Sequence, residues 1–539
     1  MEKKRETKRE IIISVGLAVL FAFFLTAGWQ MENEKENLFH HWETYLSFSF
    51  FFLLFSVGIL LGFRRLQKKE RTQQETVPKE PGSKMKKSSF FLLQAGMILC
   101  WIPVLLSAYP GFFCYDATYQ FKEVAEGIYN MHHPLLHTFM LGKTLTLSKA
   151  YLGSYEAGVL IFCILQMILI TGCFCMVIRF MERHGVGKGL LIASYCYYSL
   201  YPTCVMFGLC TTKDSIFTAL VTVHLLFLFE LLTDKEEFFH RPVSVAFFAL
   251  TAVGAMLFRN NGVYSYLLFL PFFVVLARGI RRKSLVLAGG CVIVAVLFTK
   301  GLALWFGAEN NDGLREMLSV PAQQLARTYD REGSSFFEEE EKQKLYSFIS
   351  EGDLERYNGK LADPVKANLH VGLNSTLPEF VGLWLRTGIR APEIYMDALL
   401  MQTYQAWYPF TIPDGYCGGN AKERYRGSES CYFALETEEP AKADSKLPGL
   451  LKGYEFIARH MTFDSLPVIP VIFSIGTMFW ILLYMLAYAV CCKKGGAAGM
   501  LLLILCLCMT CLLGPIMLVR YYLILFFALP LVAGSYKLI

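Results

Sequence analysis

Charged residues are scarce in this sequence. Only 18% of its 539 residues are Asp, Glu, Lys or Arg, whereas a soluble domain carries about 25%. Hydrophobic residues make up 54% of the chain and recur in long runs. The scarcity of charge argues against a large soluble enzyme, and the apolar runs indicate a multi-pass membrane protein.

A strong basic excess is also missing. The net charge is +6, and the surplus Lys and Arg stand in short blocks between apolar runs, as in the cytoplasmic loops of membrane proteins. We therefore expect no nucleic-acid partner. The sequence has no internal repeat of fixed period and no HExxH motif, so neither a repeat architecture nor that type of metal site is indicated.

Twelve apolar runs are candidate membrane-spanning helices, each of which needs roughly 20 apolar residues. They cover residues 11–29, 45–63, 88–108, 156–178, 189–208, 215–233, 243–258, 263–277, 284–305, 465–490, 497–517 and 519–536. Residues 132–152 are ambiguous. The first run follows a basic segment, as in a signal peptide, but it is too long for one and no small-residue cleavage site follows. The sequence predicts an all-α polytopic membrane protein with about twelve spans.

The basic segments set the expected orientation. Residues 64–87, 179–188, 278–283 and 491–496 are all basic, and threading twelve spans from a cytoplasmic N-terminus places them on one side. That side is predicted to be the cytoplasm. The opposite, extracytoplasmic face then receives four segments, namely 109–155, 210–214, 259–262 and 306–464.

The predicted chain has five parts. These are a transmembrane hairpin (1–63), a basic cytoplasmic linker (64–87), a transmembrane core (88–305) with a first outer loop (109–155), a helix-rich extracytoplasmic domain (306–464) and C-terminal transmembrane helices (465–539). Most of the sixteen cysteines lie in apolar runs and act there as small apolar residues. Cys417 and Cys431 flank a polar loop, and whether they form a disulfide is left open.

Five ionisable residues lie at the ends of apolar runs on the predicted outer face. They are Asp116, Lys213, Asp214, Arg259 and Arg520. Charges at membrane depth are costly and raise a functional hypothesis. Each also has a structural explanation, because the two Asp side chains could cap helices and Lys213 and Arg259 could extend to the headgroups. Their gathering on one face favours a shared site, with Lys213, Asp214, Arg259 and Arg520 as its candidate substrate-binding residues.

Three histidines follow in the first outer loop, at His132, His133 and His137. With Asp116 they could hold a divalent metal, since His133 and His137 are spaced to share a helix face. Pro134 stands between these two, and no further metal motif accompanies them. We favour hydrogen bonding of the histidines to a substrate phosphate or sugar. No cofactor is predicted beyond this possible metal.

Several motifs together resemble a known family. They are "YPGFFCYDATYQ", "HHPLLHT", "TTKDSIF", "FRNNG", "LSVPAQQLAR" and "YQAWYP". From about residue 90 to the end, the chain resembles a group of uncharacterised bacterial multi-pass membrane proteins. More broadly, spans three to nine resemble the GT-C glycosyltransferases, polytopic enzymes that use polyprenyl-phosphate sugars. The shared order is a transmembrane helix, an outer loop with an early Asp, and an amphipathic helix along the membrane.

The resemblance implies a GT-C-like helical bundle that moves a sugar, with inversion, from a polyprenyl-phosphate carrier to a cell-envelope glycan, lipid or protein. Asp116 matches the family's first-loop acid, the general base, and Lys213 and Arg259 match the phosphate-binding cations. The sequence "YDA" departs from the usual pair of acids, which leaves open whether Asp214 supplies a second one. Sugar-compatible residue types in 306–464 are Gln323, Gln324, Trp407 and Tyr408.

Two other functions remain open. A transporter or flippase of lipid-linked saccharides should show repeated halves and broken spans in matching positions, and neither is evident in the sequence. An envelope glycan polymerase or ligase would use similar basic residues on the outer face, and the sequence hardly separates it from a glycosyltransferase.

Overall fold

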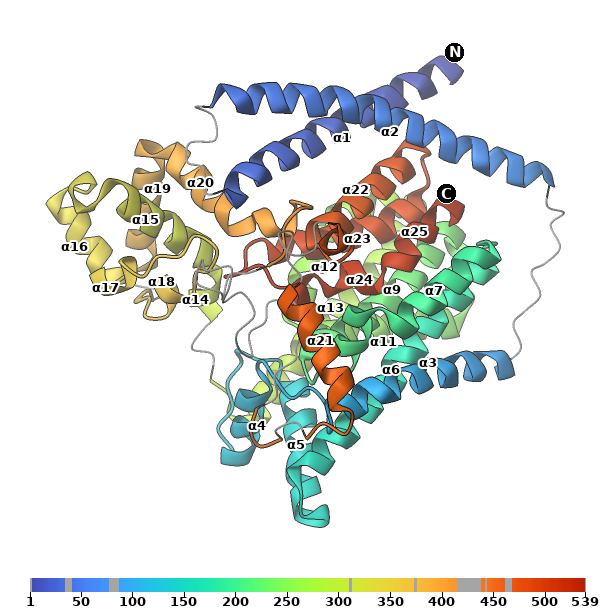
Figure 1. Ribbon diagram of the computed structural model, residues 1–539, viewed down its shortest axis with the longest axis horizontal. Helices are drawn as coiled ribbons and strands as arrows, with labels where there is room; N and C mark the ends of the chain where they lie inside the picture. Colours follow the sequence, from blue (N-terminus) through green and yellow to red (C-terminus); the bar gives the residue numbers. More distant parts are fainter. Residues whose placement is uncertain are drawn as a thin grey trace.

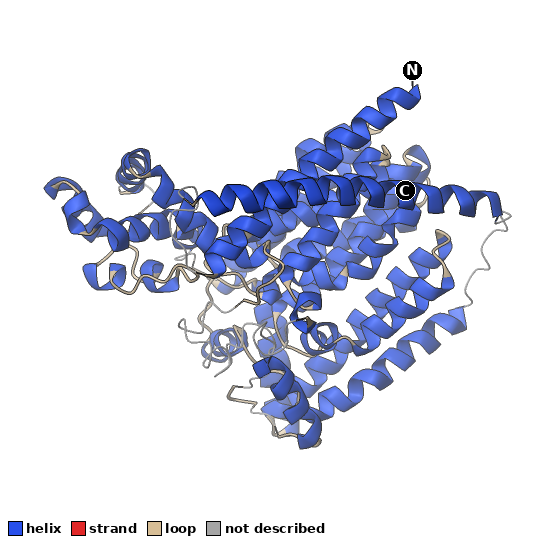
Figure 2. Cartoon of the chain, turned by 45° about the horizontal axis from the view of Figure 1, so that its top comes forward, coloured by secondary structure: helices blue, strands red, loops and turns tan. Residues whose placement is uncertain are grey.

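The computed structural model describes residues 2–33, 41–76, 87–309, 313–372, 376–413, 438–441, 444–460 and 468–538. Helices joined by loops form this part of the chain, and it contains isolated β-bridges but no strand (Figure 2). The predicted all-α class is confirmed. The linker residues 77–86 and the two cysteines Cys417 and Cys431 lie outside the described residues.

Long apolar helices confirm a membrane-embedded protein. Among the described residues, seven are long and apolar enough to cross a bilayer: Thr7–Glu32, Trp42–Lys68, Ser89–Ser107, Tyr155–Arg183, Lys213–Asp234, Arg281–Phe306 and Val519–Leu538. They belong to α1 (Glu2–Glu32), α2 (Trp42–Thr76), α3 (Lys87–Ser107), α6 (Tyr155–Arg183), α9 (Lys213–Asp234), α13 (Arg281–Phe306) and the C-terminal elements η4 (Val519–Tyr522), α24 (Leu523–Phe527) and α25 (Leu529–Leu538). Helix α2 continues to Thr76 and so covers about half of the region expected to be a linker.

The remaining predicted runs form shorter or bent helices. Helices α7 (Lys188–Leu200) and α8 (Pro202–Gly208) make one pair bent by 50°. Four apolar helices fall short of the full length, namely α11 (Pro242–Phe258), α12 (Asn261–Leu276), α22 (Ile475–Cys491) and α23 (Gly495–Cys511). Each of the twelve apolar runs thus contains helix within its described residues. The lengths of these helices do not establish twelve spans, so that number stays a prediction.

Two helix breaks place loops at one end of the bundle. Pro202 begins α8, and the preceding Tyr201 is extended (φ −69°, ψ 120°), as expected before a proline, so the helix bends there. Arg259 ends α11 in an extended conformation (φ −156°, ψ 129°) before α12 begins. The start of α9 and the junction of α11 with α12 lie at the same end of the bundle, because Arg259 Nη1 lies 2.7 Å from Asp214 Oδ1.

The first outer loop contains two helices, α4 (Ala117–Glu126) and α5 (Leu135–Leu152). Helix α4 is amphipathic and buries Ala117, Gln120 and Val124. It packs closely on α5 because Gly142 has no side chain: a Cβ there would lie 2.4 Å from Val124. The ambiguous region 132–152 is therefore mostly helix α5, which lies against α4 and α6.

Residues 313–403 form a group of helices beside the bundle (Figure 1). The helices are α14 (Gly313–Met317), α15 (Ser319–Glu332), α16 (Glu339–Phe348), α17 (Glu351–Leu354), α18 (Asp363–Lys366), α19 (Leu377–Arg390) and α20 (Pro392–Thr403), with η1 (Ser334–Phe336) between α15 and α16. Helices α15 to α19 share a hydrophobic cluster that includes Leu325, Phe348 and Phe380, whereas Leu400 and Met401 of α20 pack in the core of the bundle. We call this group the insertion.

The N-terminal hairpin packs on both other parts. Helix α1 lies against α22, where Phe21 stacks on Trp480 with ring centroids 4.1 Å apart. It also contacts α20 and η2 (Tyr404–Ala406), and the rings of Phe24 and Trp407 lie 5.1 Å apart. The hairpin thus joins the C-terminal bundle to the insertion. The remaining described helices are α10 (Glu236–Phe239) and α21 (Pro448–His460), with η3 (Ile469–Ile472) before α22.

Candidate functional site

Backbone hydrogen bonds hold two loops together at one end of the bundle. Phe112 N donates to Leu209 O (3.2 Å) and Thr211 N donates to Phe112 O (3.0 Å). The Sγ atoms of Cys114 and Cys210 lie 3.4 Å apart beside this bridge, fully buried. The bridge therefore brings the segment before α4 next to the start of α9.

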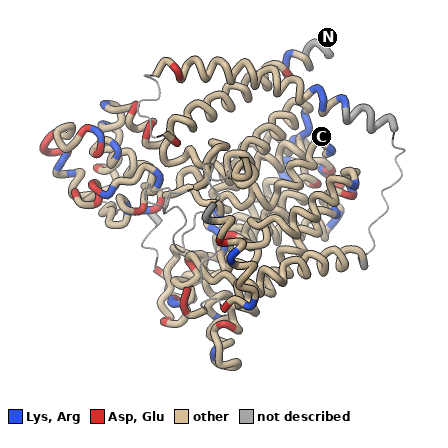
Figure 3. The backbone as a smooth tube through the Cα atoms, viewed as in Figure 1, with Lys and Arg blue, Asp and Glu red and all other residues tan. Residues whose placement is uncertain are grey.

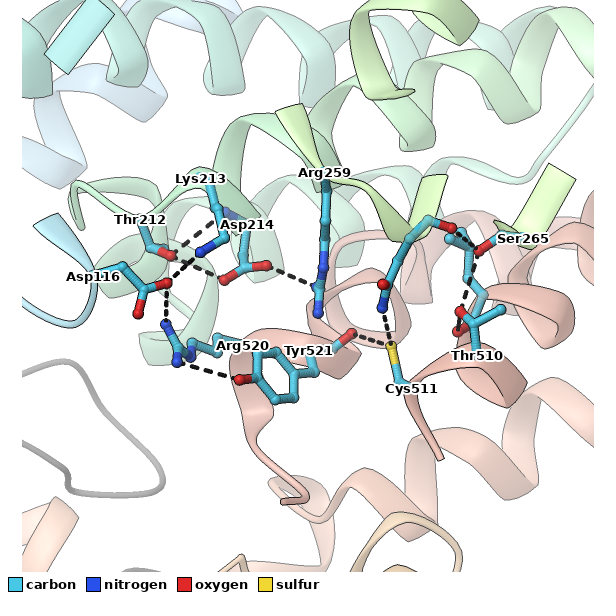
Figure 4. A network of polar contacts seen from close by, with 12 residues as sticks. Asp116, Thr212, Lys213, Asp214, Arg259, Ser265, Thr510, Cys511, Arg520 and Tyr521 are labelled. Atoms are coloured by element: carbon cyan, nitrogen blue, oxygen red, sulfur yellow. Dashed lines mark hydrogen bonds and ion pairs between the residues drawn. The ribbon is translucent and has the colours of Figure 1, made fainter. Parts of the chain in front are cut away.

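Asp116 is the centre of the charge cluster that results (Figure 4). Its Oδ2 atom is ion-paired with Lys213 Nζ and accepts a hydrogen bond from Arg520 Nη1 (3.1 Å). His133 Nδ1 lies 3.9 Å from the same oxygen. The ion pair and the hydrogen bond both use Oδ2, and the other oxygen, Oδ1, accepts no hydrogen bond from the described residues. The side chain remains 23% exposed, so one face of the carboxylate is open.

The surroundings of Asp116 keep it ionised. Burial opposes ionisation, but Arg520, Lys213 and His133 outweigh it and hold the pKa of the carboxyl well below its usual range. Asp116 also occupies the N-cap position of α4, yet its side chain makes no capping hydrogen bond. The structural explanation offered for this residue, a helix cap, is therefore not supported.

Arg520 is held by aromatic rings as well as by Asp116. Its guanidinium carbon lies 4.5 Å from the ring centroid of Tyr115 and 5.0 Å from that of Tyr521, and Nη2 donates to the Tyr521 hydroxyl (3.3 Å). Tyr115 adopts φ 59°, a left-handed conformation that is uncommon for a bulky residue. The Arg520 Nε–H is buried and has no hydrogen-bond partner among the described residues.

A second ion pair lies beside the first. Arg259 Nη1 is 2.7 Å from Asp214 Oδ1, and Asp214 is fully buried. The Thr212 hydroxyl donates to Asp214 Oδ2 (3.0 Å) and is also the N-cap group of α9, accepting from Asp214 N. Thr212 and not Asp214 therefore caps the helix. The Tyr521 ring lies 4.8 Å from the Arg259 guanidinium carbon and links the two ion pairs.

The cluster carries one positive charge in excess. It contains three cations (Lys213, Arg259 and Arg520) and two carboxylates (Asp116 and Asp214). His133 does not change the balance, since burial and the neighbouring Lys213 keep the pKa of its imidazole well below the ordinary value. A partly buried cluster with an unbalanced cation suits an anionic ligand, and phosphate suits arginine in particular.

The three predicted histidines do not act together. His133 Nδ1 lies 3.4 Å from Lys213 Nζ, which places it in the cluster. His132 is exposed beside it, with the two rings 4.6 Å apart. His137 is buried and its Nδ1 lies 3.1 Å from Gln120 Oε1, so it joins α5 to α4. The described residues contain no group of three or more His, Cys, Asp or Glu side chains arranged to hold a metal.

Two residues of this region were not singled out from the sequence. Tyr521 follows Arg520 directly and stacks with both arginines. Glu123 lies seven residues after Asp116 on α4, and its Oε2 accepts a hydrogen bond from Asn130 N (3.4 Å). Burial raises the pKa of Glu123 to about 7, although Asn130 and Lys213 act against this rise. The helical spacing of Asp116, Gln120 and Glu123 is the signal that could have found it.

The sugar-compatible residues lie elsewhere and serve packing. Gln324 donates to Tyr395 O (3.1 Å) and accepts from Trp384 Nε1 (2.8 Å), so its amide is used inside the insertion. Gln323 Nε2 donates to Asn358 O (2.7 Å). Trp407 and Tyr408 are buried against the hairpin and α22; the first stacks with α1, and the second contacts Gly28 and Gly476. None of the four is among the contacts of the charge cluster.

Comparison with known proteins gives a family but no function. No curated protein and no solved structure matches this chain. A family model described as "Family of unknown function (DUF6020)" matches residues 125–535. The match includes Lys213, Asp214, Arg259 and Arg520, and it begins after Asp116. Because it covers well over half of the sequence, the chain belongs to the DUF6020 family.

Proposed function

We propose that this protein is a GT-C-like glycosyltransferase that moves a sugar from a polyprenyl-phosphate carrier to a cell-envelope acceptor. The observation that carries the proposal is the cluster of three cations and two carboxylates, one of them the partly exposed Asp116, at one end of a membrane bundle. A polyprenyl carrier keeps its chain in the bilayer and its phosphate at the surface, which is where helix ends present charged side chains.

The cations supply the binding energy for the phosphate. Lys213 and Arg520 share Asp116 Oδ2, and the Arg520 Nε–H has no partner among the described residues. A phosphate would accept hydrogen bonds from both cations. Arg259 lies on the other side of the Tyr521 ring from Arg520. We assign neutralisation of the leaving phosphate to these three residues.

Phosphate binding also prepares the base. While both cations are held on its Oδ2 atom, Asp116 has a low pKa and takes up a proton poorly. A donor phosphate that draws Lys213 and Arg520 toward itself raises the pKa of Asp116. The Oδ1 atom then accepts the proton of the acceptor hydroxyl as that oxygen attacks the anomeric carbon. The bond from the sugar to the phosphate oxygen breaks, the phosphate keeps the electron pair, and the configuration inverts. General-base catalysis of this kind contributes roughly 10²–10⁴-fold.

The proposal includes twelve spans in the cell membrane, a cytoplasmic N-terminus and an extracytoplasmic site. Its support is the distribution of basic residues. The loops at Lys235–Arg241, Arg278–Lys283 and Lys493–Lys494 join helix ends opposite those that carry the cluster. Lys and Arg positions are frequent along the tube at that end of the bundle, near the C-terminus (Figure 3). Such loops are typical of the cytoplasmic side.

The test is a transfer assay in membranes with polyprenyl-phosphate sugars as donors. Asp116→Asn keeps the size of the side chain but removes the base, and we expect transfer to fall at least about 10²-fold. Lys143→Gln, on the exposed side of α5, is a matched control that should transfer normally. Undiminished transfer by Asp116→Asn would exclude the general-base role.

A flippase of lipid-linked saccharides is the second candidate, and one observation favours it. His224 lies at the middle of α9, buried in the bundle; its Nδ1 is 3.1 Å from Thr251 Oγ1, and its Nε2 is hydrogen-bonded to the Tyr266 hydroxyl. Polar groups at mid-membrane are common on transport paths. Both ring nitrogens have partners, however, as in a polar contact that holds helices together. Loss of flipping in liposomes on His224→Phe, with transfer absent from the wild type, would favour the flippase.

A glycan polymerase or ligase would use the same cluster. The two enzymes differ in the donor, which is a single lipid-linked sugar for a transferase and a preassembled chain for a polymerase or ligase. Supplying both donors to the wild type therefore distinguishes them.

A further inference from the structure

A cavity of about 270 Å³ lies in the insertion, where α19 turns into α20. Its lining includes Trp384, Leu385, Gly388, Tyr395 and Met396. Gly388 leaves room for the Tyr395 ring, because a Cβ at Gly388 would lie 2.7 Å from that ring. The cavity is separate from the charge cluster, to which none of its lining residues belongs.

The polar groups of the cavity wall already have partners. Trp384 Nε1 donates to Gln324 Oε1 (2.8 Å), and Gln324 Nε2 donates to Tyr395 O (3.1 Å). The Tyr395 hydroxyl donates to Trp384 O (2.8 Å). These bonds lie inside the protein, so the wall offers apolar surface to a ligand. A sugar or a phosphate would find no free partner on these groups, whereas a hydrocarbon chain needs none.

The mouth of the cavity is unusually apolar for an exposed surface. Ile389 is 80% exposed, and Leu385 and Met396 are exposed beside it. The opposite face of α19 buries Phe380, Leu383 and Thr387 in the core of the insertion. Helix α19 therefore has apolar residues both on its buried face and on its exposed face. Exposed apolar patches of this kind mark contact with a protein, a ligand or a membrane.

The position of the cavity favours contact with a membrane. Helix α20 packs against α1, and after η2 the Thr411 hydroxyl donates to Glu32 at the C-terminal end of α1 (2.8 Å). Figure 1 shows α19 and α20 beside the ends of α1 and α2 that face the insertion. Helix α2 begins there with exposed Trp42 and Tyr45, and aromatic residues at a helix end are typical of the bilayer surface. The cavity therefore lies beside the end of the hairpin that carries these aromatic residues.

Basic side chains lie beside the mouth. Arg386 and Arg390 are on α19 within one turn of Ile389, and both are ion-paired with Glu341. Arg386 is also exposed to solvent, which leaves part of its guanidinium open to a headgroup phosphate. An apolar stripe flanked by arginines is the pattern of an amphipathic helix that lies in the surface of a membrane.

We propose that the cavity between α19 and α20 binds one hydrocarbon chain of a bilayer phospholipid, with the headgroup beside Arg386. This contact attaches the insertion to the membrane surface. It is independent of the proposed transfer reaction, since it involves none of the cluster residues.

The test is photo-crosslinking of the full chain in phospholipid nanodiscs. A photoreactive amino acid is placed at Ile389, and in a second protein at Glu339, which is 83% exposed on α16 and serves as the matched control. We expect phospholipid adducts at position 389 at least tenfold above those at 339, read by mass spectrometry. Equal labelling at the two positions, or adducts to a second protein molecule in place of lipid, would overturn the proposal.

Three variants separate the lipid contact from folding and from the proposed function. With the photoreactive residue at Met396, Leu385→Glu is expected to lower the lipid adduct several-fold while leaving the Tm unchanged, because Leu385 is exposed. Leu385→Gln on the same background should give an intermediate loss. Asp116→Asn should leave the adduct unchanged, so failure of the glycosyltransferase proposal would not affect this result. An undiminished adduct with Leu385→Glu would contradict the proposal.

Discussion

At the scale of single residues, an aromatic ring and two carboxylates offset the repulsion between the three cations of the cluster, Lys213, Arg259 and Arg520. Tyr521 lies between two guanidinium groups, 4.8 Å from Arg259 and 5.0 Å from Arg520, and its ring face attracts both. Each arginine also has its own carboxylate, Asp214 or Asp116. The carboxylate that remains partly exposed is Asp116, which makes it the most accessible acid of the two ion pairs.

Asp116→Asn is expected to lower stability as well as activity. The change removes the counter-ion of Lys213 and Arg520 and leaves two cations in a largely buried place. We expect a loss of about 2–3 kcal/mol, less than for a fully buried pair because the side chain is 23% exposed. Thermal unfolding in detergent measures it. Added inorganic phosphate should restore more of the Tm in the variant than in the wild type, and a variant as stable as wild type without phosphate would argue against this pairing.

Glu123 gives a prediction about pH. Its pKa is about 7 in the folded protein and 4.5 ordinarily, so between these values the folded chain holds a proton that the unfolded chain has released. Stability therefore falls as pH rises through this window and is constant above it. In Glu123→Gln the side chain does not titrate, so this loss of stability between pH 4.5 and 7 should be absent. Above pH 7 the variant should be more stable than wild type by about 1 kcal/mol, a value reduced because the side chain is only half-buried.

The measurement for Glu123 is the Tm at both ends of the window. Near pH 4.5 the variant and the wild type should have the same Tm, and the Tm of the variant should exceed that of the wild type increasingly as pH rises toward 7. Glu126→Gln is a suitable control because Glu126 is exposed on the same helix. A difference that is constant across the window would contradict the assignment.

At the scale of elements, close helix contacts depend on a few glycines. Gly476 in α22 lies against the backbone of Tyr408, and a Cβ there would approach Tyr408 O to 2.2 Å. The contact fixes the segment that leaves the insertion against the bundle. Backbone atoms cannot swing aside as a flexible side chain can, so this position tolerates no larger residue without movement of a whole segment.

Gly476→Ala is therefore expected to destabilise the protein by about 3 kcal/mol, at the upper end of overpacking effects. Thermal unfolding is the measurement. Gly453→Ala in α21 is the control, since a Cβ there meets nothing within 4 Å, and alanine is the better helix former. If the two variants had equal Tm values, the close contact between α22 and Tyr408 would be wrong.

At the scale of the whole molecule, the protein is a helical membrane bundle with a charged site at one end, a hairpin along one side and an insertion beside the hairpin (Figure 1). The family match begins at residue 125, so it leaves out the hairpin and Asp116. The hairpin is nonetheless packed against α22 and α20.

The predicted orientation of the helices in the membrane can be tested with inserted epitopes. An epitope inserted after Gly153, between α5 and α6, should be accessible to antibody in intact cells, because it lies at the end of α6 that faces the site. An epitope after Lys235, at the opposite end of α9, should become accessible only after permeabilisation. The same accessibility for both insertions would overturn the orientation, and with it an extracytoplasmic site.

The sequence alone determined the class of the protein and most residues of the site. Long apolar runs must become helices in a bilayer, because only a helix or a closed barrel satisfies the backbone there. Charges at the ends of such runs stand out because they are costly, and this singled out Asp116, Lys213, Asp214, Arg259 and Arg520. Helix ends were less certain, as at α2, which continues into the region predicted to be a linker.

Only the tertiary structure decided which of these residues meet. Asp116 pairs with Arg520, 404 residues away in the sequence, and Asp214 pairs with Arg259. The structure also shows that His137 contacts Gln120, and that the Gln324 amide donates a hydrogen bond to Tyr395 O inside the insertion. The physical reason is that apolar periodicity is local: it shows that a helix forms and which side is apolar, whereas ion pairs depend on how distant helices pack and on the direction in which each side chain leaves its helix.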